Sequence, residues 1–238
     1  MAYIAIAGDV HGALGAFYDR ISKMQKAADA PIAAVFQVGD FQIYSKKSQI
    51  DKAVRKYGKG EFPQWFCDQR PAPVPTYVIL GNHDDADLYY QYAGKEIVPS
   101  LHILRQGDVT SIETCGVTLN IGVLGGNYSS RYFEFKPSQL PRGRRRHYTK
   151  THIESLAAKT PFDILLTHEA PLGFVFKHGQ DIGRPEISGL ISATKPRFAF
   201  FGHHHRCYAG MIGDTKIIGL PDANDEGGIA LFEASELC

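Results

Sequence analysis

The 238-residue sequence contains few cysteines, one tryptophan and no long apolar run. Its four cysteines lie far apart without a CxxC pair, which predicts free thiols rather than a zinc cage or a disulfide framework. Nowhere are there about 18 consecutive apolar residues, the length that a membrane-spanning helix needs. The first residues, MAYIAIAGDV, show neither the basic leader nor the apolar length of a signal peptide. We therefore expect a cytoplasmic protein with no membrane partner.

Neither sign of charge dominates the chain. Lysine and arginine number 26 and aspartate and glutamate 25, so the net charge is +1. We do not expect the overall charge to attract nucleic acid, although a local basic patch could still bind it. The 44% hydrophobic and 21% charged content is typical of globular proteins and excludes disorder, collagen and coiled coil. Because no linker or internal repeat interrupts residues 1–238, we predict a single domain.

Five short apolar runs predict buried strands, and a polar residue follows each of them. Apolar residues at helical spacing predict a helix over 14–28, and turn residues predict hairpins over 109–124 and 206–232. Ligands of α/β sheets collect at the carboxyl ends of the strands, so these ends together locate a site. The five runs are 2–7, 32–38, 77–80, 164–167 and 198–201.

The polar residues at these ends include many of the ten histidines, together with carboxylates and an amide, which are ligands of divalent metals. Eight such groups are more than one ion needs, and two adjacent ions would share Asp40. Mn²⁺, Fe²⁺ and Zn²⁺ all suit these donors. We expect the glycine that opens most of the motifs to let the backbone turn sharply. The eight are Asp9 and His11 in GDVHG, Asp40 in GDFQ, Asn82 and His83 in GNHD, His168 in THEAP, and His203 and His205 in GHHH.

In this order, GDVHG, GD, GNHD, a later single histidine and GHxH resemble the motifs of the calcineurin-like metallophosphoesterase superfamily, over residues 9–205. The resemblance implies an α/β fold with four αββα layers, in which two mixed sheets face each other between flanking helices. It also implies a two-metal centre at the strand ends. One ion would be held by Asp9, His11, Asp40 and His205, and the other by Asp40, Asn82, His168 and His203. In that arrangement His83 faces the leaving group and Asp84 orients it.

Details of the motifs favour one branch of the superfamily. Protein Ser/Thr phosphatases continue their second motif with Asp-Arg-Gly, whereas this chain has GDFQIY. GDFQ, the stretch 62–75 before YVILGNHD, CGVTLNIGVLGGNYSS and DILLTHEAP instead resemble the lariat debranching enzyme family, phosphodiesterases that act on 2′,5′ linkages. That family typically has cysteine at the position of Asp9. We therefore expect a complete two-metal site here, and we favour Mn²⁺.

These residues predict metal-assisted hydrolysis of a phosphate ester, preferably a diester in RNA or a nucleotide. Two ions about 3.5 to 4 Å apart would hold a bridging hydroxide that attacks phosphorus. His83 would protonate the departing oxygen as general acid. A phosphomonoesterase acting on a phosphoprotein or small metabolite would use the same groups. A non-catalytic scaffold of this fold is the third alternative.

Candidate substrate contacts lie in GGNYSSR and in the arginine-rich run that follows it. Asn127, Tyr128 and Arg131 could reach the phosphate or a base, and Arg146 could contact the backbone of a nucleic acid. Aromatic residues beside these charges would suit base stacking. The alternative is a solvated surface loop with no role in binding.

Overall fold

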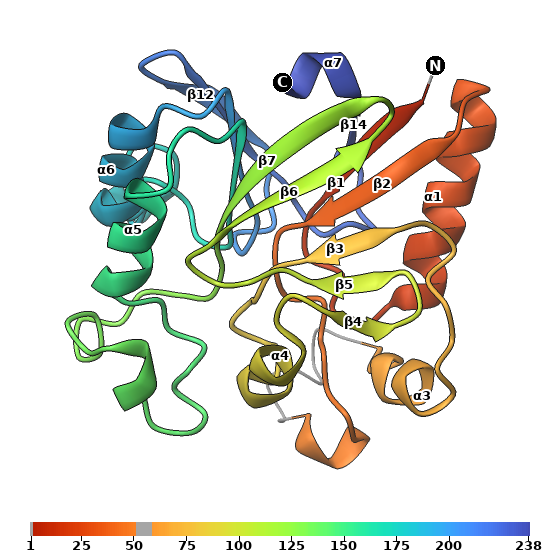
Figure 1. The fold of residues 1–238 in the computed structure, drawn as a ribbon, viewed down its shortest axis with the longest axis horizontal. Helices are drawn as coiled ribbons and strands as arrows, with labels where there is room; N and C mark the ends of the chain where they lie inside the picture. The colour runs from red at the N-terminus through yellow and green to blue at the C-terminus, as the bar shows by residue number, and fades with distance from the viewer. Residues whose placement is uncertain (1, 51–58) are drawn as a thin grey trace.

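A computed structural model describes residues 2–50 and 59–238, and two six-stranded sheets that face each other form its centre (Figure 1). The first sheet has the order β14-β1-β2-β3-β5-β4. Its inner strands pair in parallel, and β14 and β4 pair antiparallel at the two edges. The strands are β1 (Tyr3–Ala7), β2 (Ile32–Gln37), β3 (Thr76–Val78), β4 (Glu96–Val98), β5 (Leu101–Ile103) and β14 (Ile229–Glu233).

The second sheet has the order β12-β13-β11-β8-β7-β6. Pairing is parallel from β13 to β7, and an antiparallel hairpin closes each edge. The strands are β6 (Val109–Thr114), β7 (Val117–Leu124), β8 (Ile164–Thr167), β11 (Phe198–Phe201), β12 (Tyr208–Ile212) and β13 (Thr215–Gly219). A separate two-stranded hairpin consists of β9 (Phe176–Lys177) and β10 (Gln180–Asp181).

Helices cover the outer face of each sheet (Figure 1). Apolar residues of α1, α3 and α4 pack on the first sheet, and those of α5 and α6 pack on the second. In α1, Leu14, Phe17 and Ile21 are buried at the spacing of one helical face. The helices are α1 (Leu14–Ala28), α3 (Phe62–Cys67), α4 (Ala86–Tyr92), α5 (Lys150–Ala157), α6 (Pro185–Thr194) and α7 (Ala234–Leu237), with 3-10 turns η1 (Lys47–Gln49) and η2 (Pro137–Gln139).

Alternating side chains fill the two sides of each sheet. Ile4 and Ile6 belong to the core between the sheets, whereas Ala5 and Ala7 belong to the core beneath the helices of the first sheet. Because both faces of β1 and β11 are buried, these two strands are apolar throughout, as is typical of parallel strands between two layers. The predicted four-layer α/β sandwich is confirmed.

Most of the predicted elements occur where the sequence indicated them. The strands at 164–167 and 198–201, the helix at 14–28 and the hairpin at 109–124 are confirmed. The run 77–80 is partly wrong, since β3 ends at Val78 and Ile79 and Leu80 are buried beyond the strand. The prediction of free thiols is confirmed for all four cysteines. No helix within the described ranges is both long and apolar enough to cross a membrane.

Candidate metal centre

The first group of predicted metal ligands lies where β1 and β11 end. Asp9 and His11 follow β1, and His205 follows β11. Nε2 of His205 is 3.0 Å from Oδ2 of Asp9 and 3.1 Å from Nε2 of His11. One potential ligand atom from each residue lies within 4.8 Å of the others. One carboxylate and two imidazoles therefore converge, although no two of these three residues are adjacent in the chain.

The second group lies where β2, β8 and β11 end and consists of Asp40, His168 and His203. Nε2 of His168 is 3.5 Å from Oδ2 of Asp40 and 2.9 Å from Oδ1 of Asn82. Nδ1 of His168 lies 2.8 Å from the carbonyl oxygen of Val38, which can only accept a hydrogen bond. The proton on Nδ1 thus orients the ring and turns Nε2 toward the carboxylate, as such backbone contacts do for metal-ligating histidines.

The two groups are neighbours. The backbone N–H of His203, in the second group, donates to Oδ1 of Asp9, in the first, at 3.0 Å. Asp9, Asp40 and His168 are almost fully buried. The structure therefore brings all seven predicted metal ligands to one place, at the edge that the strand ends of both sheets share.

Four of these predicted ligands have left-handed backbone conformations. The φ angles are 49° for His11, 57° for Asp40, 66° for His203 and 51° for His205. Residues other than glycine rarely adopt this region, and each such residue costs about 1–3 kcal/mol. Strained residues of this kind concentrate at functional sites, where the surrounding structure holds them in place.

The glycines of the motifs serve mainly to let side chains approach the backbone. Of the four predicted turn glycines, only Gly39 has a positive φ, of 96°. A Cβ on Gly39 would lie 2.5 Å from Nδ1 of His168, and a Cβ on Gly81 would collide with Asp40. A larger residue at either position would displace a predicted ligand. The sequence predicted sharp turns at these glycines, but it did not predict this need for space.

Opposite charges stabilise each other inside the second group. Burial alone would raise the pKa of Asp40, but the adjacent His168 imidazole lowers it below its usual range. Burial opposes protonation of His168, yet Asp40 raises the pKa of that imidazole to about 10. Burial and His168 lower the pKa of His203 to about 2, so this ring is neutral, the form that binds metals. A divalent cation would supply the positive charge that a proton on His168 otherwise provides.

His83 lies beside the predicted ligands. Its backbone N–H donates to Oδ1 of Asp40 at 2.6 Å, and its ring centre is 5.9 Å from that of His11. The carboxylate of Asp84 accepts three backbone N–H bonds of 2.7 to 2.8 Å. Asp84 therefore fixes the loops that carry Asp40 and His83. The three donors are Gln42, Ile43 and Gly81.

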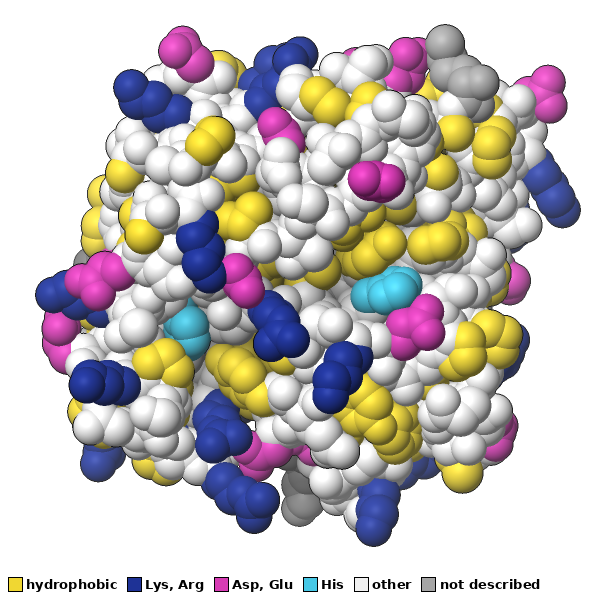
Figure 2. Space-filling view, viewed as in Figure 1, with side chains coloured by type: hydrophobic (Ala, Val, Ile, Leu, Met, Phe, Trp, Pro, Cys, Tyr) yellow, Lys and Arg dark blue, Asp and Glu magenta, His cyan; other side chains and the backbone are white. Residues whose placement is uncertain are grey.

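Three of the four predicted substrate residues are linked to the predicted ligands. Nη1 of Arg146 donates to the carbonyl oxygen of Asn82 at 3.2 Å, and the N–H of Asn127 donates to the carbonyl of Arg146 at 3.0 Å. Within the described ranges, Nε of Arg146 and Oδ1 of Asn127 are buried without a hydrogen-bond partner. Tyr128 is linked through Glu169, whereas Arg131 is exposed and has no contact with the ligands in the described part of the chain. Figure 2 shows Lys and Arg side chains gathered at the lower left and centre, over the loop between β7 and α5 and over α4.

An ion pair with a buried carboxylate lies next to His168 and was missed by the sequence reasoning. Glu169, which is 3% exposed, accepts the N–H of Tyr128 at 2.6 Å and pairs with Nη2 of Arg184 at 2.9 Å. The Arg184 guanidinium also lies 5.2 Å from the centre of the Tyr128 ring. The only signal in the sequence was the charged residue of THEAP that follows directly after a buried strand.

Comparison with known proteins decides the family. Residues 2–207 match the family model of the calcineurin-like phosphoesterases. The chain belongs to this family. Calcineurin-like phosphoesterases are metal-dependent hydrolases of phosphoric esters, and the carboxylates, imidazoles and amide at these strand ends fit divalent ions in chemistry and spacing.

The chain is similar to lariat debranching enzymes in sequence. It is 27% identical to the enzyme of Entamoeba histolytica over 92% of this chain, and 24% identical to that of Arabidopsis thaliana over 99%. It spans 68% and 60% of the length of these two relatives, and 43% of the human enzyme.

Solved structures share the fold at lower identity. The protein TT1561 of Thermus thermophilus superposes with a TM-score of 0.60 over 97% of this chain and 98% of its own length, at 14% identity. GAP50, the anchor in the inner membrane complex of Plasmodium, superposes with a TM-score of 0.50 over 92% of this chain and 71% of its own, at 12% identity. At such identities the similarity establishes the fold alone.

Proposed function

We propose that this calcineurin-like phosphoesterase is a two-metal phosphodiesterase that acts on RNA or a nucleotide. The observation that carries the proposal is the pair of adjacent ligand groups, Asp9, His11 and His205 beside Asp40, His168 and His203. Asn82 completes the second group, and Asp40 is the proposed bridge between the ions. Two divalent ions bound there would activate water toward phosphorus and polarise the phosphoryl oxygens.

The residues around the proposed ions have distinct tasks. His83 would hold a proton at the oxygen that departs, and the three N–H bonds to Asp84 keep its loop in place. Asn127 and Arg146 would bind the phosphate or an adjacent nucleotide, because each has a buried polar atom without a partner in the described chain. Glu169 and Arg184 would hold Tyr128 in position.

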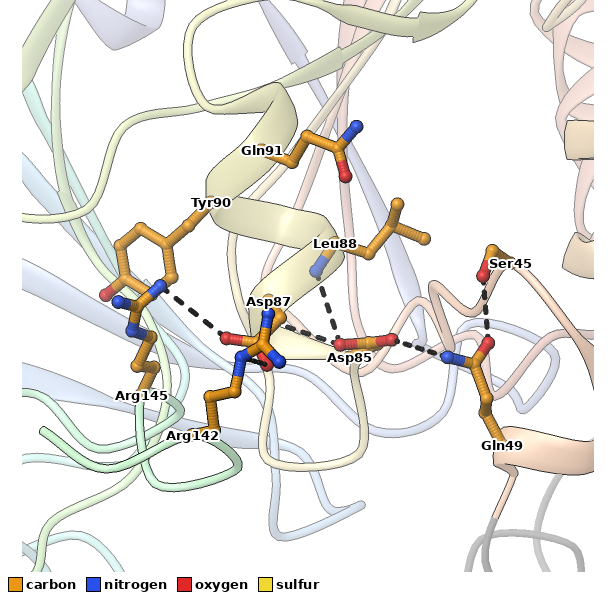
Figure 3. Close-up of a pocket in the computed structure, with 9 residues that line it drawn as sticks. All are labelled: Ser45, Gln49, Asp85, Asp87, Leu88, Tyr90, Gln91, Arg142 and Arg145. Atoms are coloured by element: carbon orange, nitrogen blue, oxygen red, sulfur yellow. Dashed lines mark hydrogen bonds and ion pairs between the residues drawn. The ribbon is translucent and has the colours of Figure 1, made fainter.

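Two hollows favour a diester over a monoester, and one of them includes a predicted metal ligand in its lining. One, of about 560 Å³, begins at Asp85 of the GNHDD turn, and Figure 3 shows Arg142 and Arg145 pointing into it toward Asp87 of α4. The other, of about 400 Å³, includes His203 in its lining. Both fall in the range of small-molecule sites, about 300 to 1,000 Å³. A phosphodiester carries a group on each of two ester oxygens, whereas a monoester needs room for one.

Metal analysis and two small substrates test the proposal. The full chain, stripped with a chelator and reloaded with Mn²⁺, Fe²⁺ or Zn²⁺, should bind two ions and hydrolyse bis(p-nitrophenyl) phosphate faster than p-nitrophenyl phosphate. The reverse preference would identify a phosphomonoesterase. A chain with neither metal nor turnover would be a scaffold.

Lariat debranching relatives support a 2′,5′ linkage as the substrate within this class. A panel of 2′,5′- and 3′,5′-linked oligonucleotides with Mn²⁺ tests this choice. Faster hydrolysis of the 2′,5′ linkage is the expected result. Equal rates on both linkages would indicate a phosphodiesterase without preference for the linkage and would contradict the debranching assignment.

We further propose that residues 1–238 form one domain. The core between the sheets draws residues from both of them, and β14, near the end of the chain, pairs with β1 at its start. A single cooperative unfolding transition, coincident by near-UV and far-UV circular dichroism, is the expected observation. Two separate transitions would contradict it.

A further inference from the structure

A hollow with aromatic and basic walls adjoins His203, and neither the metal-ligand motifs nor the predicted substrate residues of 127–146 account for it. The β9–β10 hairpin forms one side of it, and the residues that follow β11 form the other. Its lining includes Phe176, Lys177, His203, His204, Arg206 and Tyr208. Because His203 belongs both to this lining and to the second ligand group, a molecule in the hollow would touch the proposed metal centre.

One aromatic ring in the lining of the hollow is unusually exposed to solvent. The Phe176 side chain is 59% exposed, although phenylalanine is among the residues most often buried. Tyr208 lies on the other side of the hollow, and its ring stacks on Phe201 at 5.8 Å, which fixes its orientation. An exposed aromatic ring beside a fixed one suits a flat ligand, since bases stack on such side chains in proteins that bind single strands.

The charged side chains that line the hollow are basic and lie outside the ion pairs of the described residues. Lys177 and Arg206 are exposed, and neither belongs to an ion pair in the part of the chain that the structure describes. His204 contributes a polar atom, because its Nε2 is buried and has no hydrogen-bond partner among the described residues. A flat group attached to phosphate would match this combination of rings, cations and a free polar atom.

We infer that this hollow is a subsite for the nucleobase next to the scissile phosphate, which stacks on Phe176 while Lys177 and Arg206 lie near the flanking phosphate. The inference rests on the proposed phosphodiesterase function and adds the residues that hold one side of the substrate. Phe176 contributes contact area through its ring and takes no part in proton transfer or metal binding. Removing the ring should therefore matter only for substrates that have a base at that position.

The test pairs a change in the protein with a change in the substrate. A dinucleotide is compared with two analogues, each lacking one base, on the wild-type chain and on Phe176→Ala, all loaded with the same metal. In the wild type, loss of one particular base should lower kcat/KM about 5-fold or more, the lower end of what stacking one base contributes. In Phe176→Ala that preference should disappear, and Phe176→Trp should restore it.

A matched control and the contrary outcomes separate the two proposals. Met211→Ala removes another exposed apolar side chain, 55% exposed on β12 and outside the hollow, and should leave the base preference intact. Equal losses on the dinucleotide and both analogues, or an unchanged preference in Phe176→Ala, overturn the subsite alone. A wild-type chain that hydrolyses no nucleotide ester overturns the proposed function and the subsite with it.

Discussion

The strand-end ligands and the segment 126–149 differ in what holds their side chains in place. Asp9, Asp40 and His168 are nearly inaccessible to solvent and lie within three residues of the ends of paired strands, so the sheets position them. The segment 126–149 is irregular and mostly exposed or half-buried, and a few long-range contacts hold it in place. A site built on strand ends tolerates changes in distant side chains, whereas a loop held by few contacts depends on each of them.

Asp40→Asn should give the largest effect, because it removes the proposed bridge while keeping an acceptor for the His83 N–H. Each ion supplies several kcal/mol of transition-state stabilisation, so kcat/KM should fall at least about 10⁴-fold. Metal content, measured by mass spectrometry, should fall below two ions per chain. Asp87→Asn, at a half-buried position of α4, is the matched control and should keep both ions. Full metal content in Asp40→Asn would contradict the assignment of Asp40 as the bridge between the ions.

His83→Ala should keep its metal and lose turnover. On a nucleotide ester we expect a loss of about 10²–10⁴-fold, the usual contribution of a general acid. On bis(p-nitrophenyl) phosphate the loss should be much smaller, because p-nitrophenolate departs without a proton. His102→Ala, which removes a half-exposed ring stacked on Tyr77, should leave both rates unchanged. Equal losses on both substrates would assign His83 another role.

The difference between the two regions also explains what the sequence could predict. The strands at 164–167 and 198–201 are continuous apolar runs, so their ends and the residues that follow were visible in the sequence. β5 and the β9–β10 hairpin have two or three residues per strand, too few for a periodic pattern. The pairing of Glu169 with Arg184 joins residues that meet only after folding, and no local pattern encodes it.

His152, in the first turn of α5, tests the contact at the buried end of the segment. Its Nδ1 accepts the N–H of Thr149 at 3.1 Å and so caps α5. Burial lowers the pKa of His152 to about 4, whereas an unfolded histidine titrates near 6.5. Its contribution to stability is therefore complete above pH 6.5 and is lost as the pH falls toward 4. Glutamine at this position can cap the helix without titrating.

The difference in unfolding free energy between the wild type and His152→Gln should therefore change by about 3 kcal/mol from pH 7 to pH 4. Urea unfolding at several pH values measures it. His178→Gln, at an exposed position in the β9–β10 turn, is the control and should show no such change. A constant difference for His152→Gln would mean that the folded chain accepts a proton at this residue.

Glu169→Gln tests the contact that ties Tyr128 to the strand end. The substitution weakens the charged hydrogen bonds to the Tyr128 N–H and to Arg184, which should cost about 2 kcal/mol of unfolding free energy. Activity on nucleotide esters should fall through a higher KM, with metal content unchanged. Glu113→Gln, exposed on β6, is the control. Loss of metal in Glu169→Gln would show that the ion pair supports His168 instead of the segment.

The smallest effect on stability should come from the arginines over α4. Arg142 and Arg145 pair with Asp87 at 3.7 and 3.6 Å on the surface, so replacing both with glutamine should change the unfolding free energy by less than about 1 kcal/mol. If both contact phosphates, the slope of log K for single-stranded RNA against log salt should fall by about 1.4, or 0.7 for each contact. Lys159→Gln removes an exposed cation outside the segment and should leave the slope unchanged. An unchanged slope in the double variant would mean that these arginines only hold the loop to α4, and that the nucleic acid meets the molecule elsewhere.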